Sequence, residues 1–157
     1  MFIKPEIAIR KGKITDMVAV HNLVIELAVY ENAGDAVSTR VKDYEDAFTE
    51  GIFEVLVAEQ QEEVIGMMLY YMTYSTWKGK MIYLEDFVVR EDYRRFGVGQ
   101  LLFDAFITES RKKEAALVKW QVLDWNEPAL AFYRKNKAII EKEWFNCKVF
   151  LTSPPPL

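Results

Sequence analysis

The sequence is short of the residues that several chemistries need. Its 157 residues include one cysteine, Cys147, and one histidine, His21. One cysteine excludes an intrachain disulfide, and one cysteine with one histidine cannot supply the ligands of a common zinc site. We therefore expect neither a disulfide framework nor a metal centre.

Long apolar runs and basic clusters are also missing. No window reaches the ~18 uncharged apolar residues of a membrane span, and residues 1–5 lack the apolar core of a signal peptide. The net charge is -4, and the basic runs at 94–95 and 111–113 are short. A chain of this kind has no patch for a phosphate backbone. Neither a membrane nor a nucleic acid is an expected partner, and a cytoplasmic location is the default expectation.

The residues that are present are typical of a globular protein, with 51% hydrophobic and 28% charged residues. Alternating apolar positions predict strands at 7–10, 53–59, 64–74, 81–89, 117–122, 138–145 and 148–151. Helices are predicted at 15–30, 41–49, 98–113 and 126–136. This order predicts an α/β (α+β) fold, with one mixed, largely antiparallel sheet of six to seven strands and helices on both faces. We expect a single domain over residues 1–151 and a flexible, Pro-rich tail over 152–157.

Two glycines stand between a strand and a helix in Arg94-Arg95-Phe96-Gly97-Val98-Gly99. Glycine lets the backbone turn so that successive N–H groups converge, and the start of a helix adds unpaired N–H groups. Such a loop can hold a diphosphate, with Arg94 and Arg95 as additional positive charge. Alternatively, the glycines only make a sharp turn. The spacing fits neither the Walker loop nor G-x-G-x-x-G after a first strand.

Two adjacent carboxylates, Glu85 and Asp86, interrupt an apolar strand. They face opposite sides of a regular strand, so only a bulge could direct both into one cleft. A desolvated carboxylate has a raised pKa and can serve as a general base. Alternatively, one or both lie at a solvated strand end.

Asn126 can cap a helix that carries Ala129, Phe132 and Tyr133 on one face. That face is either part of the core or the wall of a cleft. A tyrosine hydroxyl can return a proton to a leaving thiolate. Tyr133 is therefore either a general acid or a structural residue.

Taken in this order, the three segments resemble the GNAT superfamily of acetyl-CoA-dependent N-acetyltransferases. Its hallmark, Gln/Arg-x-x-Gly-x-Gly/Ala, reads here as Arg94-x-x-Gly97-x-Gly99, followed by an Asn that opens a later helix with a Tyr. The nearest branch is the spermidine/spermine N-acetyltransferase-like group, which includes thialysine acetyltransferases. Stretches that match this branch lie at 26–31, 68–74, 83–87 and 125–128, and the resemblance extends over about residues 7–150.

The resemblance implies a role for each matching residue. Glu85 would be the general base and Tyr133 the general acid. The backbone of strand residues 87–89 would bind the pantetheine arm, and the loop at 95–100 would hold the pyrophosphate. The residues that would contact coenzyme A are Phe87, Val88, Val89, Arg94, Arg95, Phe96, Gly97, Val98, Gly99, Gln100, Asn126, Pro128, Ala129 and Phe132. The residues that would border the amine site are Tyr30, Glu31, Trp77 and Asp86. The resemblance also implies a homodimer.

The implied reaction is direct transfer of an acetyl group from acetyl-CoA to a primary amine, with both reactants bound together. An amine of reference pKa ~10.4 binds as a cation and must lose a proton before it attacks. Ser75 stands where the polyamine enzymes have an acid, and the loop at 32–35 is less acidic than theirs. A diamine or lysine analogue is therefore preferred over a long polyamine. Lys137 stands where the family has glycine, so the turn after the tyrosine helix is expected to differ.

Two other classes of function fit the same residues. A regulatory module could bind an acyl-CoA without turnover, in which case coenzyme A would stabilise the protein and no amine would release thiol. A structural or interaction domain would bind no cofactor at all. The sequence favours the acetyltransferase, because all three segments are present in the family's order.

Overall fold

The computed structural model describes residues 6–152. Its helices and strands, in chain order, are β1 (Ala8–Lys11), η1 (Ile14–Asp16), α1 (Met17–Tyr30), η2 (Gly34–Ala36), α2 (Val41–Thr49), β2 (Glu54–Gln60), β3 (Glu63–Ser75), β4 (Gly79–Val89), η3 (Glu91–Tyr93), α3 (Val98–Lys112), β5 (Leu117–Lys119) and α4 (Glu127–Lys135). They fall into two compact units, residues 1–120 and 121–157. The single domain over 1–151 stays a prediction, and nearly all of the expected tail lies outside the described residues.

The first unit is built on one mixed sheet with the strand order β1-β2-β3-β4-β5. Neighbouring strands are antiparallel except for β4 and β5, which are parallel. The long hairpin of β3 and β4 closes at a turn around Trp77, where Ser75 lies opposite Gly79. The mixed α/β architecture with a largely antiparallel sheet confirms the predicted fold class.

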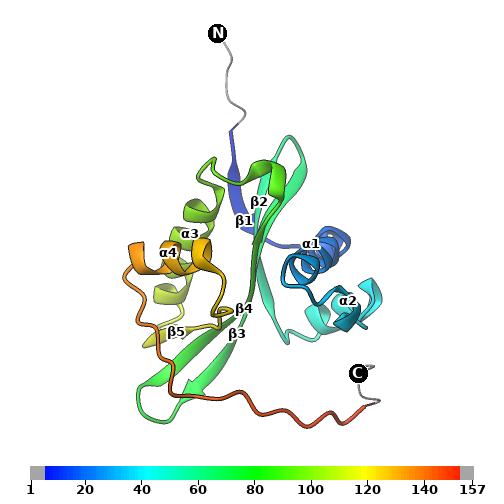
Figure 1. Ribbon diagram of the computed structural model, residues 1–157. Coiled ribbons are helices and arrows are strands. Elements are labelled where there is room, and N and C mark those ends of the chain that lie inside the picture. The colour runs from blue at the N-terminus through cyan, green and yellow to red at the C-terminus, as the bar shows by residue number, and fades with distance from the viewer. Residues whose placement is uncertain (1–5, 153–157) are drawn as a thin grey trace. The chain divides into compact units, whose positions relative to one another are not determined.

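Helices cover both faces of this sheet, with α1 and α2 on one side and α3 on the other (Figure 1). Apolar side chains of α1 pack with sheet residues in one buried cluster, which contains Met17, Val20, Leu23, Val55, Val57, Met67, Leu69 and Val88. On the other face the rings of Tyr70 and Phe106 lie 5.3 Å apart, edge to face. Gly66 lets α3 approach closely, because a Cβ there would lie 3.2 Å from Leu102 Cδ1. Burying large apolar side chains in this way stabilises the sheet by ~1.5–3 kcal/mol for each.

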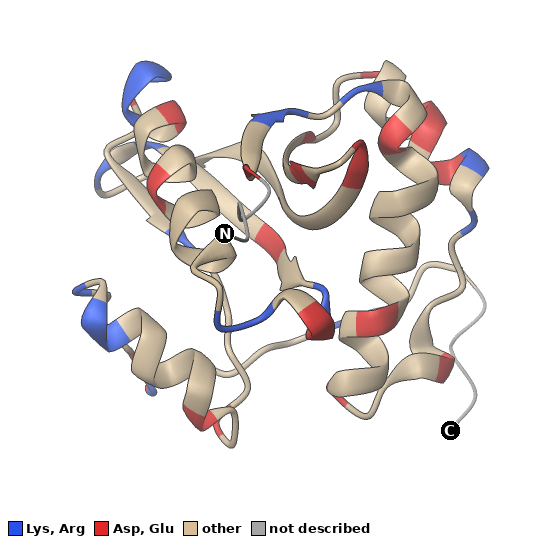
Figure 2. Cartoon of the chain, turned by 90° about the horizontal axis from the view of Figure 1, so that it is seen from above, with Lys and Arg blue, Asp and Glu red and all other residues tan. Residues whose placement is uncertain are grey.

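Acidic and basic residues are interspersed over the helices and loops (Figure 2). Two ion pairs tie α3 to the strands: Lys11 Nζ lies 3.0 Å from Glu109 Oε1, and the Lys113 ammonium lies 2.8 Å from Glu54 Oε2. Surface ion pairs of this kind contribute little stability because water and salt screen them. Their main effect is to orient α3 relative to the strands.

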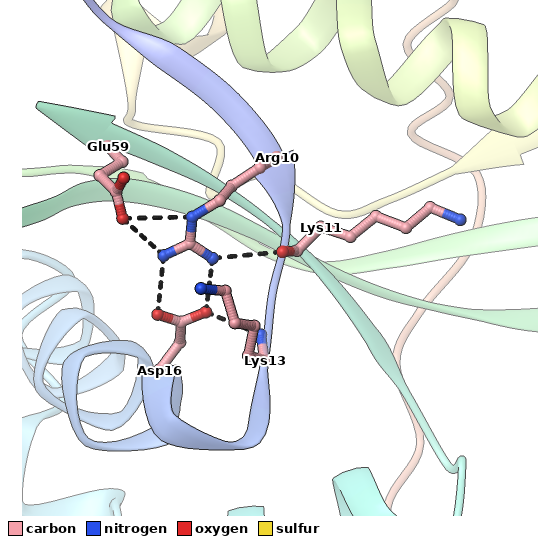
Figure 3. Close-up of polar contacts among 5 residues, drawn as sticks. All are labelled: Arg10, Lys11, Lys13, Asp16 and Glu59. Carbon is pink, nitrogen blue, oxygen red and sulfur yellow. Dashed lines mark hydrogen bonds and ion pairs between the residues drawn. The ribbon is translucent and has the colours of Figure 1, made fainter. Parts of the chain in front are cut away.

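A more buried ionic network fixes the start of α1 against the sheet (Figure 3). The Arg10 guanidinium donates to both carboxylate oxygens of Asp16, at 2.7 and 3.0 Å, and to Glu59 Oε2 at 2.7 Å. The Lys13 N–H donates to Asp16 Oδ2 at 2.7 Å. Because Asp16 is only 8% exposed, this bidentate pairing compensates a carboxylate that would otherwise be costly to bury. The network joins β1, β2 and the turn before α1.

The expected number of strands was too high. The described residues contain five, and 138–145 and 148–151, which were predicted as strands, form none. Ile139, Phe145 and Leu151 are 90%, 93% and 94% exposed. A strand needs a hydrogen-bonded neighbour as well as apolar alternation, and the described residues provide no neighbour for this segment. The predicted strand at 117–122 is shorter for the same reason, since only 117–119 pair with β4. Among residues 6–152, no helix has the length and apolar character needed to cross a bilayer.

Candidate active site

A β-bulge brings the two carboxylates of β4 to one face of the sheet. Leu69 pairs with Asp86 and Tyr70 pairs with Leu84, so Glu85 is an extra residue on β4 without a partner of its own on β3. Directly opposed residues share a face, and side chains alternate along each strand. Glu85 therefore shares the face of Tyr71, and after the bulge Asp86 returns to that face. The bulge that the two carboxylates would need in order to face one cleft is therefore present.

Glu85 lies at the exposed side of this face, where tyrosines border it. Tyr71 Oη donates a hydrogen bond of 2.8 Å to Glu85 Oε2. The Tyr71 ring stacks on that of Tyr83 at a centroid distance of 5.6 Å. Burial and the Glu85 carboxylate hold the pKa of Tyr71 well above its ordinary value. The phenol therefore stays protonated and remains a donor to the carboxylate.

Asp86 lies deeper, opposite Leu69 of the buried cluster. Burial raises the pKa of Asp86 to about 6, and the charges of Glu85 and Glu31 add to this. Burial also raises the pKa of Glu31, the residue that ends α1. Glu31, Glu85 and Asp86 are therefore close enough for their charges to interact, and this concentration of negative charge favours binding a cation.

The glycine loop opens α3 with an unusual backbone. Gly97 caps the helix with φ +81°, and Arg95 also has a positive φ of +72°. Leu101 N–H donates to the Gly97 carbonyl at 3.1 Å. Within residues 6–152, the N–H groups of Gly97, Val98 and Gly99 donate to no other group. N–H groups in a first helical turn point along the axis toward its start, where they attract anions.

Arg94, the first residue of the motif, has its side chain directed to α1. Its Nε donates to the Val89 carbonyl at 3.0 Å, and its guanidinium lies 5.2 Å above the Tyr30 ring. Glu26 Oε1 lies 3.9 Å from Arg94 Nη2 and accepts from the Glu91 N–H at 3.0 Å. A hollow of about 290 Å³ is lined by Glu26, Val29, Tyr30, Glu91 and Arg94. The end of α1 and the glycine loop are thus held together, and Arg95 is the exposed arginine of the pair.

Trp77 lies away from the carboxylates, in the turn that joins β3 and β4, and is 82% exposed. The six residue-to-residue steps from Gly79 to Glu85 along the strand span roughly 20 Å at ~3.3 Å per residue. The predicted role of Trp77 at the amine site therefore stays a prediction, and it would need an acceptor that extends along the hairpin.

In the second unit, α4 is the helix that was predicted to carry Ala129, Phe132 and Tyr133 on one face. Asn126 Oδ1 accepts from the Ala129 N–H at 3.3 Å, and a proline lies in the first turn. Tyr133 is 8% exposed, and its ring meets that of Phe132 edge to face at 5.7 Å. Lys137, just after the helix, has φ +63°. The backbone there has the left-handed conformation that glycine adopts freely and that strains a lysine.

Sequence reasoning missed several residues of this region. Tyr71 could have been found by pairing the two strands in register, since Tyr71 lies opposite Tyr83 and Glu85 follows Tyr83 on the same face two residues later. Glu26 and Tyr44 had no such signal. Tyr44 belongs to α2, and burial raises its pKa, with a further contribution from the charges of Asp86 and Glu85. Its proximity to the carboxylates depends on how α2 packs on the sheet, which no local pattern encodes.

Comparison with known proteins agrees with this arrangement. The chain is 34% identical over 153 residues to the thialysine N-epsilon-acetyltransferase of Bos taurus, and the match covers 90% of each chain. It is 29% identical over 140 residues to the human spermidine/spermine N(1)-acetyltransferase-like protein 1, covering 83% of this chain and 20% of that protein. Both relatives belong to the spermidine/thialysine branch.

A solved structure supports the fold. An aminoglycoside acetyltransferase from an uncultured soil metagenomic sample superimposes with a TM-score of 0.78 at 19% identity, covering 93% of this chain and 97% of that one. The sequence profile of the acetyltransferase (GNAT) family matches residues 21–137, from α1 past the end of α4. The chain therefore belongs to the acetyltransferase (GNAT) family, and it is an acetyltransferase.

Proposed function

We propose that this enzyme transfers an acetyl group from acetyl-CoA to the primary amine of a small cationic acceptor by direct attack. The observation that carries the proposal is the pairing of two features in one unit. Unpartnered N–H groups at Gly97, Val98 and Gly99 suit an anion, and the acids of the β4 bulge suit a cation. These are the two charges that a diphosphate cosubstrate and an ammonium acceptor bring.

The glycine loop fits the diphosphate of coenzyme A. Three consecutive N–H groups and the exposed Arg95 form a donor set for phosphate oxygens. Gly97 has no other atom within 4 Å of the position of a Cβ, so the approach to its backbone is open. In this proposal the strand residues 87–89 bind the pantetheine arm, and Asn126, Pro128, Ala129 and Phe132 also contact the cosubstrate.

Bound acetyl-CoA supplies a thioester, whose carbonyl carbon the neutral amine attacks and whose sulfur leaves. The carboxylates of Glu85 and Asp86 bind the acceptor as an ammonium and take up a proton before the attack. Tyr133 returns a proton to the departing sulfur. Holding both reactants in one site removes much of the entropic barrier of their meeting.

The preferred acceptor is a short molecule with a side-chain amine, such as a lysine analogue or a diamine. The matched relatives are named for thialysine and for spermidine and spermine. The acids that act on one another here, Glu31, Glu85 and Asp86, suit one or two nearby ammonium groups. Tyr30 would border the same site, and Trp77 would contact only a longer acceptor.

We also propose that the enzyme is a homodimer in the cytoplasm. Several apolar side chains of the C-terminal segment, among them Phe145 and Leu151, are more than nine-tenths exposed. Large exposed apolar groups commonly mark a contact with another chain, and a second copy is the simplest cover. Sedimentation equilibrium should report twice the mass of one chain, and the double change Phe145→Asp with Leu151→Asp should shift it toward the monomer.

An amine panel tests the proposed function. Purified enzyme with acetyl-CoA and thialysine, ornithine, a diamine or spermidine should release free thiol, and mass spectrometry should find the acetylated amine. Tyr133→Phe should slow turnover by about 100-fold, whereas Tyr74→Phe, at a 70% exposed position, should not. Stabilisation by coenzyme A without thiol release for any amine would indicate the binding module instead.

A further inference from the structure

The two carboxylates of the β4 bulge share a face but not an environment. Glu85 is exposed, and one of its oxygens accepts the Tyr71 hydroxyl at 2.8 Å. Asp86 is partly buried opposite Leu69, which belongs to the core cluster beneath α1. The bulge therefore produces one solvated, hydrogen-bonded acid and one desolvated acid beside it.

Glu85 is better suited to holding a charge than to taking a proton. A proton arriving at Glu85 Oε2 would compete with the hydrogen bond from Tyr71. That phenol remains protonated because burial and the Glu85 carboxylate both raise the pKa of Tyr71. The pair therefore presents a fixed anion with a free oxygen, which is the arrangement that binds an ammonium group.

Asp86 has the opposite character. The groups that act on it are Glu85 on its own strand and Glu31 after α1, and both are acids. Tyr44 of α2 and Tyr71 of β3 also lie within its electrostatic reach. Desolvation first, and then these two acids, raise the pKa of Asp86 to about 6. A general base works best when its pKa is close to the working pH.

We propose that Asp86, and not Glu85, accepts the proton of the acceptor ammonium, while Glu85 and Tyr71 anchor the acceptor's charge. This inference rests on the proposed function. The nitrogen loses two protons as its lone pair forms the C–N bond and the C–S bond breaks. One proton goes to an Asp86 oxygen and then to solvent, and the other ends on the thiol. Glu31 keeps Asp86 a stronger base by adding negative charge at the end of α1.

The pH dependence of kcat/KM separates the two carboxylates. With a fixed amine, the wild-type enzyme should show an ascending limb with an apparent pKa of about 6. Asp86→Asn should lose this limb and at least about 100-fold in kcat/KM. Glu85→Gln should keep the limb but move it to lower pH, because one of the anions that raise the Asp86 pKa is gone. Glu85→Gln should also raise KM more than it lowers kcat.

The reverse pattern, with the limb lost in Glu85→Gln and retained in Asp86→Asn, would overturn the inference. Glu50→Gln, an exposed acid after α2, is the matched control and should leave the profile unchanged. Thermal unfolding of each variant shows whether it folds.

A carboxyl carbon NMR titration gives a readout that does not depend on turnover. Asp86 of the wild type should titrate near pH 6, and its midpoint should fall in both Glu85→Gln and Glu31→Gln. An Asp86 midpoint near 4 would contradict the inference even in an active enzyme. An enzyme that acetylates no amine would refute the proposed function, and this proton transfer with it, whatever the titration shows.

Discussion

Asp86 is a residue whose ionisation opposes folding. Its pKa in the folded protein is about 6, compared with ~3.9 in an unfolded chain. Between these two values the folded state binds more protons, so the contribution of Asp86 to stability is complete below pH ~4 and is lost as the pH rises to about 6. Keeping this carboxylate at its partly buried position therefore costs stability at neutral pH.

Asp86→Asn should accordingly stabilise the fold at pH 8 by about 3 kcal/mol. The gain should be small at pH 4 and vanish below it, because Asp86 becomes protonated in both states only below the unfolded pKa of ~3.9. Urea unfolding at the two pH values measures this difference. A stability gain that does not vary with pH would show that the change acts through packing and not through charge.

Asp16 shows the opposite behaviour. The hydrogen bonds from Arg10 lower its pKa in the folded state, against the effect of burial. A lowered pKa stabilises the fold above the unfolded value of ~3.9, and this contribution is lost as the pH falls through the folded value. The same hydrogen bonds and ion pairs connect β1, β2 and the start of α1 (Figure 3).

Asp16→Asn should lower the free energy of unfolding at pH 7 by about 1.5–3 kcal/mol. It should also flatten the loss of stability below pH 4, as followed by chemical unfolding. The matched control is Asp46→Asn, which removes the exposed pair with Lys42 on α2 and should have a much smaller effect. Equal losses in the two variants would contradict the importance of the buried network.

At the scale of elements, much of the layout could be predicted from the sequence. Apolar periodicity located the helices and the first five strands, and the bounds of α2 agree with the prediction. The sequence showed that a bulge was needed for Glu85 and Asp86 to share a face, but it could not show that the bulge exists, because the register depends on the partner strand. The prediction of two strands after α4 was wrong, because an alternation of apolar and polar residues does not show whether another strand is available for pairing. The contacts of Glu26 and Tyr44 join distant segments and could not be read from local sequence.

The glycine loop makes the clearest element-level prediction. Gly97→Ala should lower stability by about 1 kcal/mol, because alanine is strained at φ +81°. It should also raise KM for acetyl-CoA, because it disturbs the N–H groups that we propose hold the diphosphate. Gly51→Ala, after α2 at φ +72° and equally open, carries the same strain away from the site. It should lose similar stability without changing that KM. Equal KM changes in both variants would remove the loop from the binding site.

The turn after α4 offers a stabilising change. Lys137 has φ +63° in a position where glycine has no steric cost. Lys137→Gly should therefore raise stability by about 0.5–1 kcal/mol, as measured by thermal or urea unfolding. Ala131→Gly, at an exposed position in the middle of α4, is the control and should destabilise, because glycine weakens a helix interior. A loss of stability in Lys137→Gly would show that the lysine side chain makes a contact of greater value than the strain.

At the scale of the whole molecule, two regions of opposite electrostatic character stand out: the N–H groups of the glycine loop and the acids of the β4 bulge. In the proposed function, an acidic chain with interspersed charges (Figure 2) binds an anion through backbone N–H groups and a cation through carboxylates. This division lets an acidic protein hold a strongly anionic cosubstrate without a basic patch. The family profile runs from α1 past α4 and covers parts of both units.

A crystal structure of the enzyme with coenzyme A and an acceptor amine tests this account most directly. We predict diphosphate oxygens within hydrogen-bond distance of the N–H groups of Gly97, Val98 and Gly99. The acceptor nitrogen should lie between the thiol and the carboxylates of Glu85 and Asp86. Coenzyme A bound elsewhere, with those N–H groups facing only solvent or other protein atoms, would contradict the account.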